Sequence, residues 1–193
     1  MRILVLYSHP VETSFNASLH EVIVRTLKNA GHDVDDCDLY AEGFEPALTR
    51  QERLDYHDTD INQANVASYV ERLEAADALV LCYPVWNFGF PAMLKGFLDR
   101  VFLPGVSFKM RDGNVIPSLH NIKKMVAVTH YGGSRIRAFL VGDPPRKNVK
   151  RMLRAVIKPF APVEYHALYD MNNATDAQRA AFLKKVEQAI ARF

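Results

Sequence analysis

The segment Ile3-Leu4-Val5-Leu6-Tyr7 is a run of apolar residues, and it is followed by apolar residues at helical spacing, at Leu19, Val22, Ile23 and Leu27. This pattern predicts a strand followed by an amphipathic helix. The same alternation returns along the chain, with further strands predicted at Val34–Leu39, Ala78–Tyr83, Met125–Thr129 and Val163–Tyr169. Five βα units in alternation predict an α/β fold in which helices cover both faces of a parallel sheet.

Helix boundaries are indicated by prolines and by a capping pattern. Pro91 begins the helix after the third strand, and Pro144-Pro145 begins the helix after the fourth, because proline is tolerated in a first turn. Thr175-Asp176-Ala177-Gln178 is a capping-box pattern that starts the last helix.

Strand composition predicts the strand order. The first, third and fourth predicted strands are almost wholly apolar, whereas the second carries Asp35, Asp36 and Asp38, and the fifth carries Glu164 and His166. A strand buried on both faces is continuously apolar, so the second and fifth strands are expected at the edges. This distribution fits a flavodoxin-like, doubly wound five-stranded sheet of order 2-1-3-4-5, with a ligand crevice between strands one and three.

Two segments lie outside the repeat. Residues Tyr40–Asn62 are too long for an ordinary connection, so they form either an interface arm or a ligand flap. Residues Val106–Leu119 contain Asp112-Gly113 between two apolar stretches and predict a small β-hairpin. No composition break separates a second domain, so residues 1–193 are expected to form one domain.

Composition excludes several classes of protein. The 193 residues are 49% hydrophobic and 24% charged, which excludes disordered and fibrous chains. The apolar stretches are too short for a membrane helix or a secretory leader, so we expect a cytoplasmic protein without membrane insertion. Cys37 and Cys82 lack metal-ligand spacing and are interpreted as small buried side chains, and no metal site is predicted.

The formal net charge of +2 conceals a segregation of charge along the chain. Residues 33–77 contain 13 acidic residues against 3 arginines, whereas residues 109–158 contain 12 basic residues against 2 aspartates. A basic surface is compatible with nucleic acid, but no nucleic-acid motif is present. A solvated face, or attraction for a phosphorylated small ligand, explains the same residues, and no nucleic-acid partner is predicted.

The loop after the first strand is the first candidate ligand site, because ligands of open α/β sheets bind beyond the carboxyl ends of the strands. Its polar groups are the side chains of His9, Thr13, Ser14 and Asn16 and the free amides at the start of the helix. Together they predict a phosphate site. The alternative is plain N-capping of the helix by Ser14.

Several chemistries are excluded at this loop. The sequence has neither the glycine-rich phosphate loop of nucleoside triphosphatases nor the dinucleotide-binding G-x-G-x-x-G. It also lacks the G-x-S-x-G nucleophile elbow, which argues against an α/β-hydrolase.

The loops after the third and fourth strands carry the other candidate residues. The first of them contains Pro84, Val85, Trp86, Asn87 and Phe88. Its aromatic side chains either fill the core below a helix or line a planar conjugated ring. The second contains Thr129, His130, Tyr131, Gly132 and Gly133. Its glycines permit close backbone approach to a ligand, while His130 and Tyr131 are either functional or structural.

Four blocks of residues give the chain a family resemblance. They are His9-x-x-x-Thr13-Ser14-Phe15-Asn16, Asp38-Leu39-Tyr40 with Phe44-x-Pro46, Pro84-x-Trp86-Asn87-Phe88-Gly89-Phe90-Pro91 with the following Leu94-Lys95-Gly96, and Gly132-Gly133. On these blocks the sequence resembles the NAD(P)H:quinone oxidoreductases, a family of flavoproteins that includes mammalian quinone reductases, bacterial modulators of drug activity and ancillary subunits of potassium efflux antiporters.

The resemblance implies a cofactor and its ligands. The loop of His9, Thr13, Ser14, Phe15 and Asn16 would bind the phosphate of FAD, or of FMN. The ring would be held by Pro84–Phe88 and by Thr129, Gly132 and Gly133. The sequence departs from the family after the fourth strand, where members often carry Thr-Thr-Gly-Gly and the mammalian enzymes carry a Tyr and a His beyond the glycines.

We therefore predict a flavin-dependent oxidoreductase that takes a hydride from NAD(P)H and passes it to a quinone-like acceptor in a ping-pong reaction. His130 and Tyr131 are the candidate catalytic residues, because they are titratable and lie next to the double glycine. The resemblance also implies a homodimer. The alternative function is a flavin-binding regulatory subunit of a membrane transporter.

Overall fold

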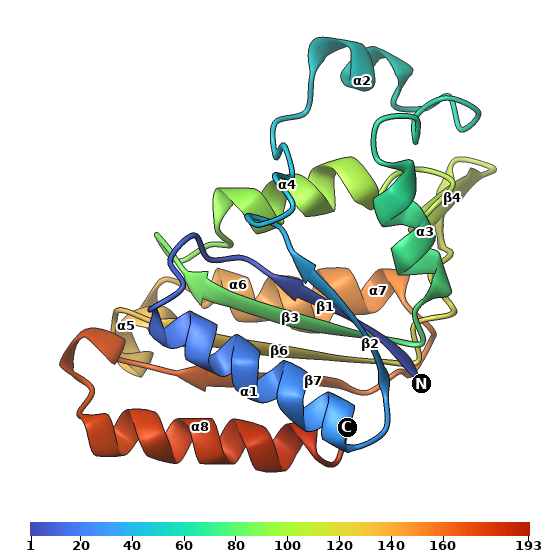
Figure 1. Cartoon of the computed structure of the whole chain (residues 1–193). Helices are drawn as coiled ribbons and strands as arrows, with labels where there is room; N and C mark the ends of the chain where they lie inside the picture. The colour runs from blue at the N-terminus through green and yellow to red at the C-terminus, as the bar shows by residue number, and fades with distance from the viewer.

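Five parallel strands form the central sheet, in the order β2-β1-β3-β6-β7. The computed structural model describes residues 1–193. The sheet strands are β1 (Arg2–Tyr7), β2 (Asp33–Asp38), β3 (Ala78–Val85), β6 (Lys124–Tyr131) and β7 (Val163–Leu168). Because β6 and β7 belong to the fourth and fifth βα units, the predicted order is confirmed, and so is the placement of β2 and β7 at the edges (Figure 1).

The strand pattern follows from burial. All residues of β3 are buried, and β1 is buried from Ile3 to Tyr7. The edge strand β2 buries only Cys37 fully. Strands covered by helices on both faces must be apolar on both faces, whereas an edge strand tolerates carboxylates.

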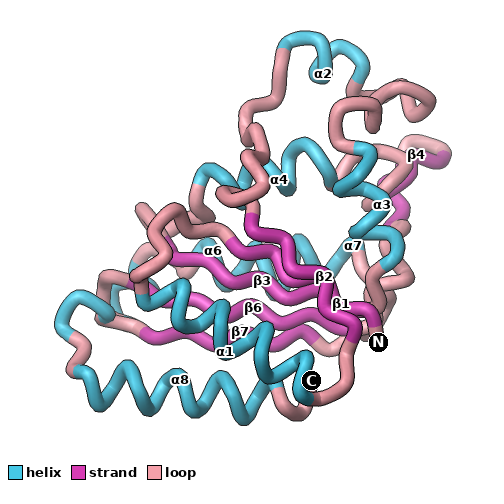
Figure 2. Tube along the Cα trace, in the orientation of Figure 1, coloured by secondary structure: helices cyan, strands magenta, loops and turns pink.

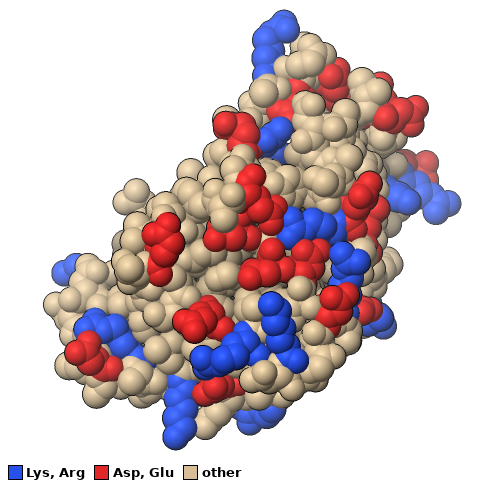
Figure 3. Space-filling model, viewed as in Figure 1, with Lys and Arg blue, Asp and Glu red and all other residues tan.

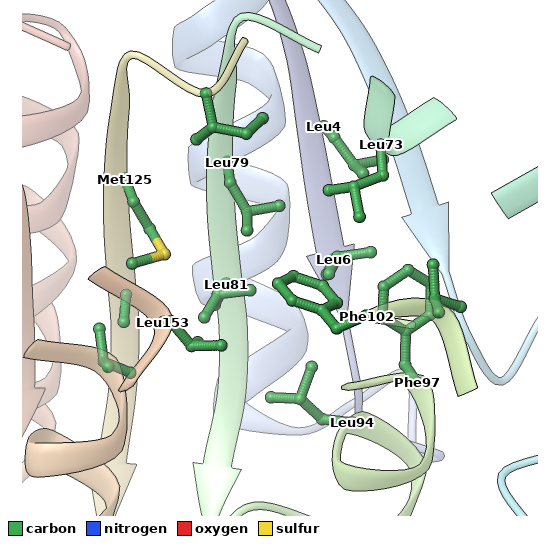
Figure 4. Close-up of a cluster of buried hydrophobic side chains, with 14 of the residues drawn as sticks. Leu4, Leu6, Leu73, Leu79, Leu81, Leu94, Phe97, Phe102, Met125 and Leu153 are labelled. Atoms are coloured by element: carbon green, nitrogen blue, oxygen red, sulfur yellow. The ribbon is translucent and has the colours of Figure 1, made fainter. Parts of the chain in front are cut away.

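Helices cover both faces of the sheet (Figures 1 and 2). One face is covered by α1 (Phe15–Asn29) and α8 (Asp176–Ile190), which pack on Ile3, Val5 and Val126. The other face is covered by α3 (Ala67–Ala75), α4 (Ala92–Val101) and the helical segment of residues 144–156. Figure 4 shows part of the larger core on this second face, where Phe97 and Phe102 meet Leu6 and Leu81.

Side-chain caps fix several helix starts. Ser14 accepts a hydrogen bond from the amide of Ala17 at the start of α1. Thr175 and Gln178 form a capping box on α8, as the sequence predicts. A second capping box, of Thr49 and Glu52, starts α2 (Arg50–Asp55) inside the long segment 40–62.

The fourth βα unit differs from its prediction. Two short helices, α5 (Arg135–Leu140) and α6 (Pro144–Lys147), precede a π-helical turn, η1 (Asn148–Leu153), which continues into α7 (Arg154–Val156). Pro144 does begin a helix, as predicted. The π-helical turn interrupts the regular α-helical spacing, and Met152 is left exposed while Val149 and Leu153 are buried.

The predicted hairpin is present. It consists of β4 (Phe108–Arg111) and β5 (Asn114–Pro117), which pair antiparallel. Asp112 and Gly113 connect them with φ of 51° and 76°. Two consecutive left-handed residues are the signature of the tight hairpin turn that an Asp-Gly pair favours.

The segment 40–62, hereafter the arm, is fastened to α4. Arg100 of α4 is bound to Glu52 and to the carbonyl oxygen of Glu45, and its guanidinium lies over the ring of Phe44. Gly96 touches the arm so closely that a Cβ at this position would lie 2.2 Å from the carbonyl oxygen of Pro46. In Figure 3, acidic side chains gather over β2 and the arm, in agreement with the charge segregation along the sequence.

Further findings bear on the class of protein. Cys37 and Cys82 are free and buried, as predicted. No helix combines the length and the apolar character that a membrane crossing requires. No group of three or more His, Cys, Asp or Glu side chains is arranged to hold a metal ion.

Candidate functional site

A cavity lies at the carboxyl ends of β3 and β6. It consists of two adjoining hollows of about 340 and 490 Å³, which share Val85, Asn87, Gly132 and Asn172. The other lining residues are Trp86, Phe88, His130, Tyr131, Gly133, Arg137 and Met171. The loops after β3 and β6 therefore meet at a common hollow, at the edge where open α/β sheets bind ligands, whereas the sequence predicts the crevice between the first and third strands.

The two central strands extend further than the sequence predicts. Pro84 pairs with His130, and Val85 pairs with Tyr131. These four residues therefore lie at strand ends and not in loops, which is a correction to the predicted boundaries. The parallel pairing continues through them, and Val85, His130 and Tyr131 line the cavity.

The loop after β3 is a tight turn with two left-handed residues. Asn87 and Phe88 have φ of 49° and 53°, and Trp86 and Gly89 exchange backbone hydrogen bonds of 3.3 and 2.8 Å across them. A left-handed aromatic residue is strained, and such strain concentrates at functional sites. The three aromatic side chains of the loop differ in exposure. Trp86 is 41% exposed, whereas Phe88 and Phe90 pack against the core.

The end of β6 alternates between the two faces of the sheet. Thr129 is fully buried, and its hydroxyl donates to the carbonyl oxygen of Tyr83 at 2.6 Å. His130 faces α1, because its ring lies 5.9 Å from that of Phe15 in an edge contact. Tyr131 points to the opposite face, where it joins the larger core.

The side chain of His130 is uncharged at neutral pH. Its Nε2 atom is buried and has no hydrogen-bond partner. Burial, assisted by repulsion from His9, lowers the pKa of His130 from 6.5 to about 4. The neutral imidazole therefore offers one donor and one acceptor at neutral pH.

Tyr131 already has partners for its hydroxyl group. This hydroxyl donates to Asp143 Oδ1 at 2.6 Å and lies 2.6 Å from the hydroxyl of Tyr165. Burial, together with Tyr165 and Asp143, raises the pKa of Tyr131 far above its usual value. The phenol therefore stays protonated, and its proton is directed at Asp143.

The loop after β1 approaches the cavity through His9 and Phe15. The ring centroids of His9 and Trp86 lie 5.8 Å apart, and Phe15 contacts His130 as described above. The Nδ1 atom of His9 accepts a hydrogen bond from the amide of Val11 at 3.0 Å. Thr13 is exposed, whereas the Ser14 hydroxyl serves as the cap of α1.

Asn16 is the unexpected residue of this loop. It is fully buried in the first turn of α1, and neither its Nδ2 nor its Oδ1 atom has a partner. Buried polar atoms are nearly always hydrogen-bonded, so an unpaired amide calls for an explanation.

The predicted site residues therefore divide into two sets. Eight line the cavity: Val85, Trp86, Asn87, Phe88, His130, Tyr131, Gly132 and Gly133. The other seven do not line it: His9, Thr13, Ser14, Phe15, Asn16, Pro84 and Thr129.

Three lining residues were missed by sequence reasoning. Arg137 comes from α5, and Met171 and Asn172 come from the turn η2 (Met171–Asn173) that follows the edge strand β7. The position of η2, directly after a predicted strand, was an available signal. The start of α5 also had a sequence signal, because serine is a preferred N-cap residue; the Ser134 side chain accepts from the amide of Arg137.

A second, more apolar hollow of about 500 Å³ lies between the arm, α4 and η1. Its lining includes Leu48, Tyr56, Leu98 and Met152. None of the predicted site residues borders it. The cavity at the strand ends is therefore the better candidate for the functional site, because His130, Tyr131 and the two glycines line it.

Known proteins similar to this chain support the family resemblance. Rat NAD(P)H dehydrogenase [quinone] 1 is 31% identical over 150 residues, which are 69% of this chain and 54% of the rat protein. The solved structure of Smu.1420 from Streptococcus mutans covers 100% of both chains with a TM-score of 0.87 at 29% identity. The NAD(P)H:quinone oxidoreductase from Methanothermobacter marburgensis covers 99% of this chain and 98% of its own, with a TM-score of 0.85 at 26% identity.

The extent of the match differs between the rat relative and the family model. The chain spans little more than half the length of the rat relative. The family model described as the flavodoxin-like fold, in contrast, matches residues 1–192. With the confirmed strand order and the cavity at the carboxyl ends of β3 and β6, this match shows that the chain belongs to the flavodoxin-like family and is related to the NAD(P)H:quinone oxidoreductases.

Proposed function

We propose that the protein is a flavin-dependent NAD(P)H oxidoreductase that reduces quinones or similar electrophilic acceptors by two electrons in a ping-pong reaction. The observation that carries this proposal is the meeting of an aromatic turn, a double glycine and a neutral histidine around one cavity. The similarity to proteins named as quinone oxidoreductases supports it.

The residues around the cavity fit a flavin. A planar conjugated ring suits a hollow walled by Trp86 and Phe88 and bordered by the backbone of Gly132 and Gly133. The unpaired polar atoms of Asn16 and the unpaired Nε2 of His130 are the buried groups that a polar ligand would satisfy. FAD is the proposed form and FMN the alternative.

Each loop has a proposed role toward the flavin. The phosphate would lie at the start of α1, against His9, Thr13, Ser14, Phe15 and Asn16. There the amides of Phe15 and Asn16 have no intrahelical acceptor and the helix dipole favours an anion. Because the Ser14 hydroxyl is occupied by capping, Ser14 would contribute through its backbone. Residues Pro84–Phe88, Thr129, Gly132 and Gly133 would border the ring.

The bound flavin would supply the hydride transfer from NAD(P)H to the acceptor. The chain would orient the reactants, exclude water and manage protons. His130 and Tyr131 are the proposed proton-handling residues. His130 is the better placed of the two, because its Nε2 atom is free whereas the Tyr131 hydroxyl is bound to Asp143.

A homodimer fits the surface next to the cavity. Arg137 of α5 lines the cavity, while the same helical segment exposes apolar side chains at Ile136, Phe139, Leu140 and Val141. Phe139 is 79% exposed. A second copy of the chain covering this segment would bury the apolar side chains and complete the cavity wall, and two-fold pairing is the commonest way to do so.

The test of the proposed function begins with the purified protein. We expect a yellow protein whose visible spectrum is that of an oxidised flavin, and chromatography of the released compound identifies FAD or FMN. Addition of NADH or NADPH should bleach the spectrum, and a quinone should restore it. A colourless protein that neither flavin can load would overturn the proposal. A flavoprotein with poor turnover and a tight stoichiometric protein partner would favour the transporter-subunit alternative.

A further inference from the structure

Asp143 occupies an unusual position at the start of α6. Its backbone is left-handed, with φ of 47° and ψ of 58°, and its side chain makes no capping hydrogen bond to the helix. The N-cap residues Ser14, Thr49, Ser134 and Thr175 all use their side chains as caps. The carboxylate of Asp143 is therefore directed at other groups.

The carboxylate binds two tyrosines. Its Oδ1 accepts from the Tyr131 hydroxyl at 2.6 Å, and its Oδ2 accepts from the Tyr169 hydroxyl at 3.5 Å. The two rings are stacked, with centroids 4.5 Å apart. A phenol has one proton to donate, so the Tyr165 hydroxyl, 2.6 Å from that of Tyr131, donates to the Tyr131 oxygen. The hydrogen bonds from Tyr165 through Tyr131 therefore converge on Asp143.

The two tyrosines flank the double glycine of the cavity. Tyr131 directly precedes Gly132 in the chain. Tyr169 directly precedes Asp170, whose amide donates to the carbonyl oxygen of Gly133 at 2.9 Å. Asn172 follows closely, and its Nδ2 atom lies 3.2 Å from the place where a Cβ on Gly132 would stand. One carboxylate therefore holds the start of the Gly132-Gly133 segment and the start of the turn that packs on it.

We propose that Asp143 is a positioning residue of the cavity, which fixes the Gly132-Gly133 backbone through Tyr131 and Tyr169. This inference rests on the proposed function for its consequence, since the fixed backbone would border the flavin ring. Asp143 itself does not line the cavity. Its effect on a ligand passes through the tyrosines.

The first test needs no flavin. Hydrogen exchange of a peptide containing Asp170, whose amide donates to the carbonyl oxygen of Gly133, is compared in the wild-type protein, Asp143→Ala and Asp143→Asn. We expect exchange roughly 10- to 100-fold faster in Asp143→Ala, which corresponds to the loss of a hydrogen bond to a charged group. Asp143→Asn keeps one acceptor and tolerates the left-handed backbone, so it should restore part of the protection.

A matched control separates backbone strain from the lost contacts. Asp112 is also a left-handed aspartate, with φ of 51°, but it lies in the exposed turn of the hairpin. Asp112→Ala should leave exchange at Asp170 unchanged. Equal exchange in wild type and in both Asp143 variants would overturn the inference.

The second test uses the flavin complex. Flavin dissociation constants and visible spectra are measured for Asp143→Ala, Tyr131→Phe and the double variant. If Asp143 acts through the Tyr131 hydroxyl, the double variant binds flavin about as weakly as the weaker single variant. Fully additive losses would contradict the inference.

The two tests distinguish this inference from the proposed function. A wild-type protein that binds no flavin would end the proposed function, while the exchange result would still decide the role of Asp143. A flavin-binding wild type with an unchanged exchange pattern in Asp143→Ala would end the inference alone. If Asp143→Ala fails to fold, Asp143→Asn replaces it in both tests.

Discussion

The ring of Phe15, in the first turn of α1, stands edge-on to the imidazole of His130 at the end of β6, with 5.9 Å between the centroids. This contact joins the start of α1 to the end of β6. Phe15 also meets Phe182 of α8, at 6.4 Å. The proposed phosphate loop and the proposed proton-handling histidine therefore share one packing unit.

The low pKa of His130 predicts a pH-dependent stability. The folded protein holds this pKa at about 4, below the ordinary 6.5, so the unfolded chain takes up the proton first as the pH falls. The contribution of neutral His130 is complete above pH 6.5 and is lost as the pH falls toward 4, by up to about 3 kcal/mol. His130→Gln should remove this part of the dependence, which urea unfolding at pH 7 and pH 4.5 measures.

A parallel loss of stability in wild type and His130→Gln between these two pH values would contradict the prediction. His166 serves as a control, because it lies on the edge strand beside Glu164. His166→Gln should show the same difference in stability between pH 7 and pH 4.5 as the wild-type protein.

Substitution of the two candidate catalytic residues should separate their roles. His130→Gln should slow reduction of the acceptor by the ~10²–10⁴-fold typical of general acid–base catalysis, with flavin still bound. Tyr131→Phe should slow this half-reaction less, because the wild-type hydroxyl already donates to Asp143. Stopped-flow measurement of both half-reactions in the two variants tests this difference. Wild-type rates in both variants would place the proton source in solvent or in a partner chain.

Replacing Asn16 should affect flavin binding and folding in opposite ways. Asn16→Ala removes a buried amide that has no partner, so the flavin-free protein should keep or gain stability. Flavin binding should weaken by about 1.5–3 kcal/mol, the value of one hydrogen bond to a charged group. Thr13→Ala should weaken binding in the same direction. Thermal unfolding and flavin titration measure the two effects.

Thr26 provides the matched control, because it lies on the same helix and also has an unpaired buried oxygen. Thr26→Val should leave flavin affinity unchanged. Unchanged affinity in both Asn16→Ala and Thr13→Ala would remove the phosphate site from this loop.

The ion pair of Arg100 and Glu52 should decide the stability of the arm. Their side chains are only 8% and 10% exposed. Burial opposes ionisation of Glu52, but hydrogen bonds from Thr49 and Arg100 outweigh it and hold its pKa at about 2. Arg100→Met should destabilise the protein by about 3–5 kcal/mol, because it leaves a buried carboxylate unpaired. Glu52 stabilises the fold fully above pH 4.5, and this contribution is lost as the pH falls toward 2.

Urea unfolding measures both effects. Lys95→Met is the control, since it breaks the exposed pair with Asp99 on the same helix and should change stability by less than about 1 kcal/mol. Similar losses in Arg100→Met and Lys95→Met would show that the buried pair contributes no more than an exposed one.

The exposed apolar side chains of α5 should govern assembly. Wild-type protein should sediment as a dimer at micromolar concentration, and Phe139→Glu should shift it to a monomer with reduced turnover. Phe160→Glu is the control, because Phe160 is 94% exposed but lies outside α5. A wild-type monomer with full reductase activity would contradict the prediction.

The strand order of the sheet can be predicted because the burial of each strand determines its residue types. Continuous apolar residues at Ala78–Tyr83 and carboxylates at Asp35 and Asp36 distinguish central from edge strands without any tertiary information. The sequence also identifies residues at the ends of β3 and β6, because strand ends of open sheets meet at one edge. Most of the cavity wall follows from this rule.

Long-range partners could not be predicted in the same way. The acceptor for the Tyr131 hydroxyl is Asp143, which a left-handed backbone directs toward it, and no spacing rule reports that direction. Asn172 reaches the cavity from the turn η2 after the edge strand β7; the sequence shows that this turn follows a strand, but not that it packs on Gly132. The arm's helix α2, in contrast, has a readable capping box at Thr49 and Glu52.

The left-handed turn of Asn87 and Phe88 has a consequence for variants selected for heat resistance. Glycine adopts this backbone without strain, so Phe88→Gly relieves the strained conformation at the same time as it deletes an aromatic wall of the cavity. Selection for thermal resistance alone would therefore drift toward glycine in this turn wherever the relieved strain exceeds the lost packing of the ring against the core, and selection for turnover would restore the bulky ring. Residue 88 is thus a position where durability and activity compete.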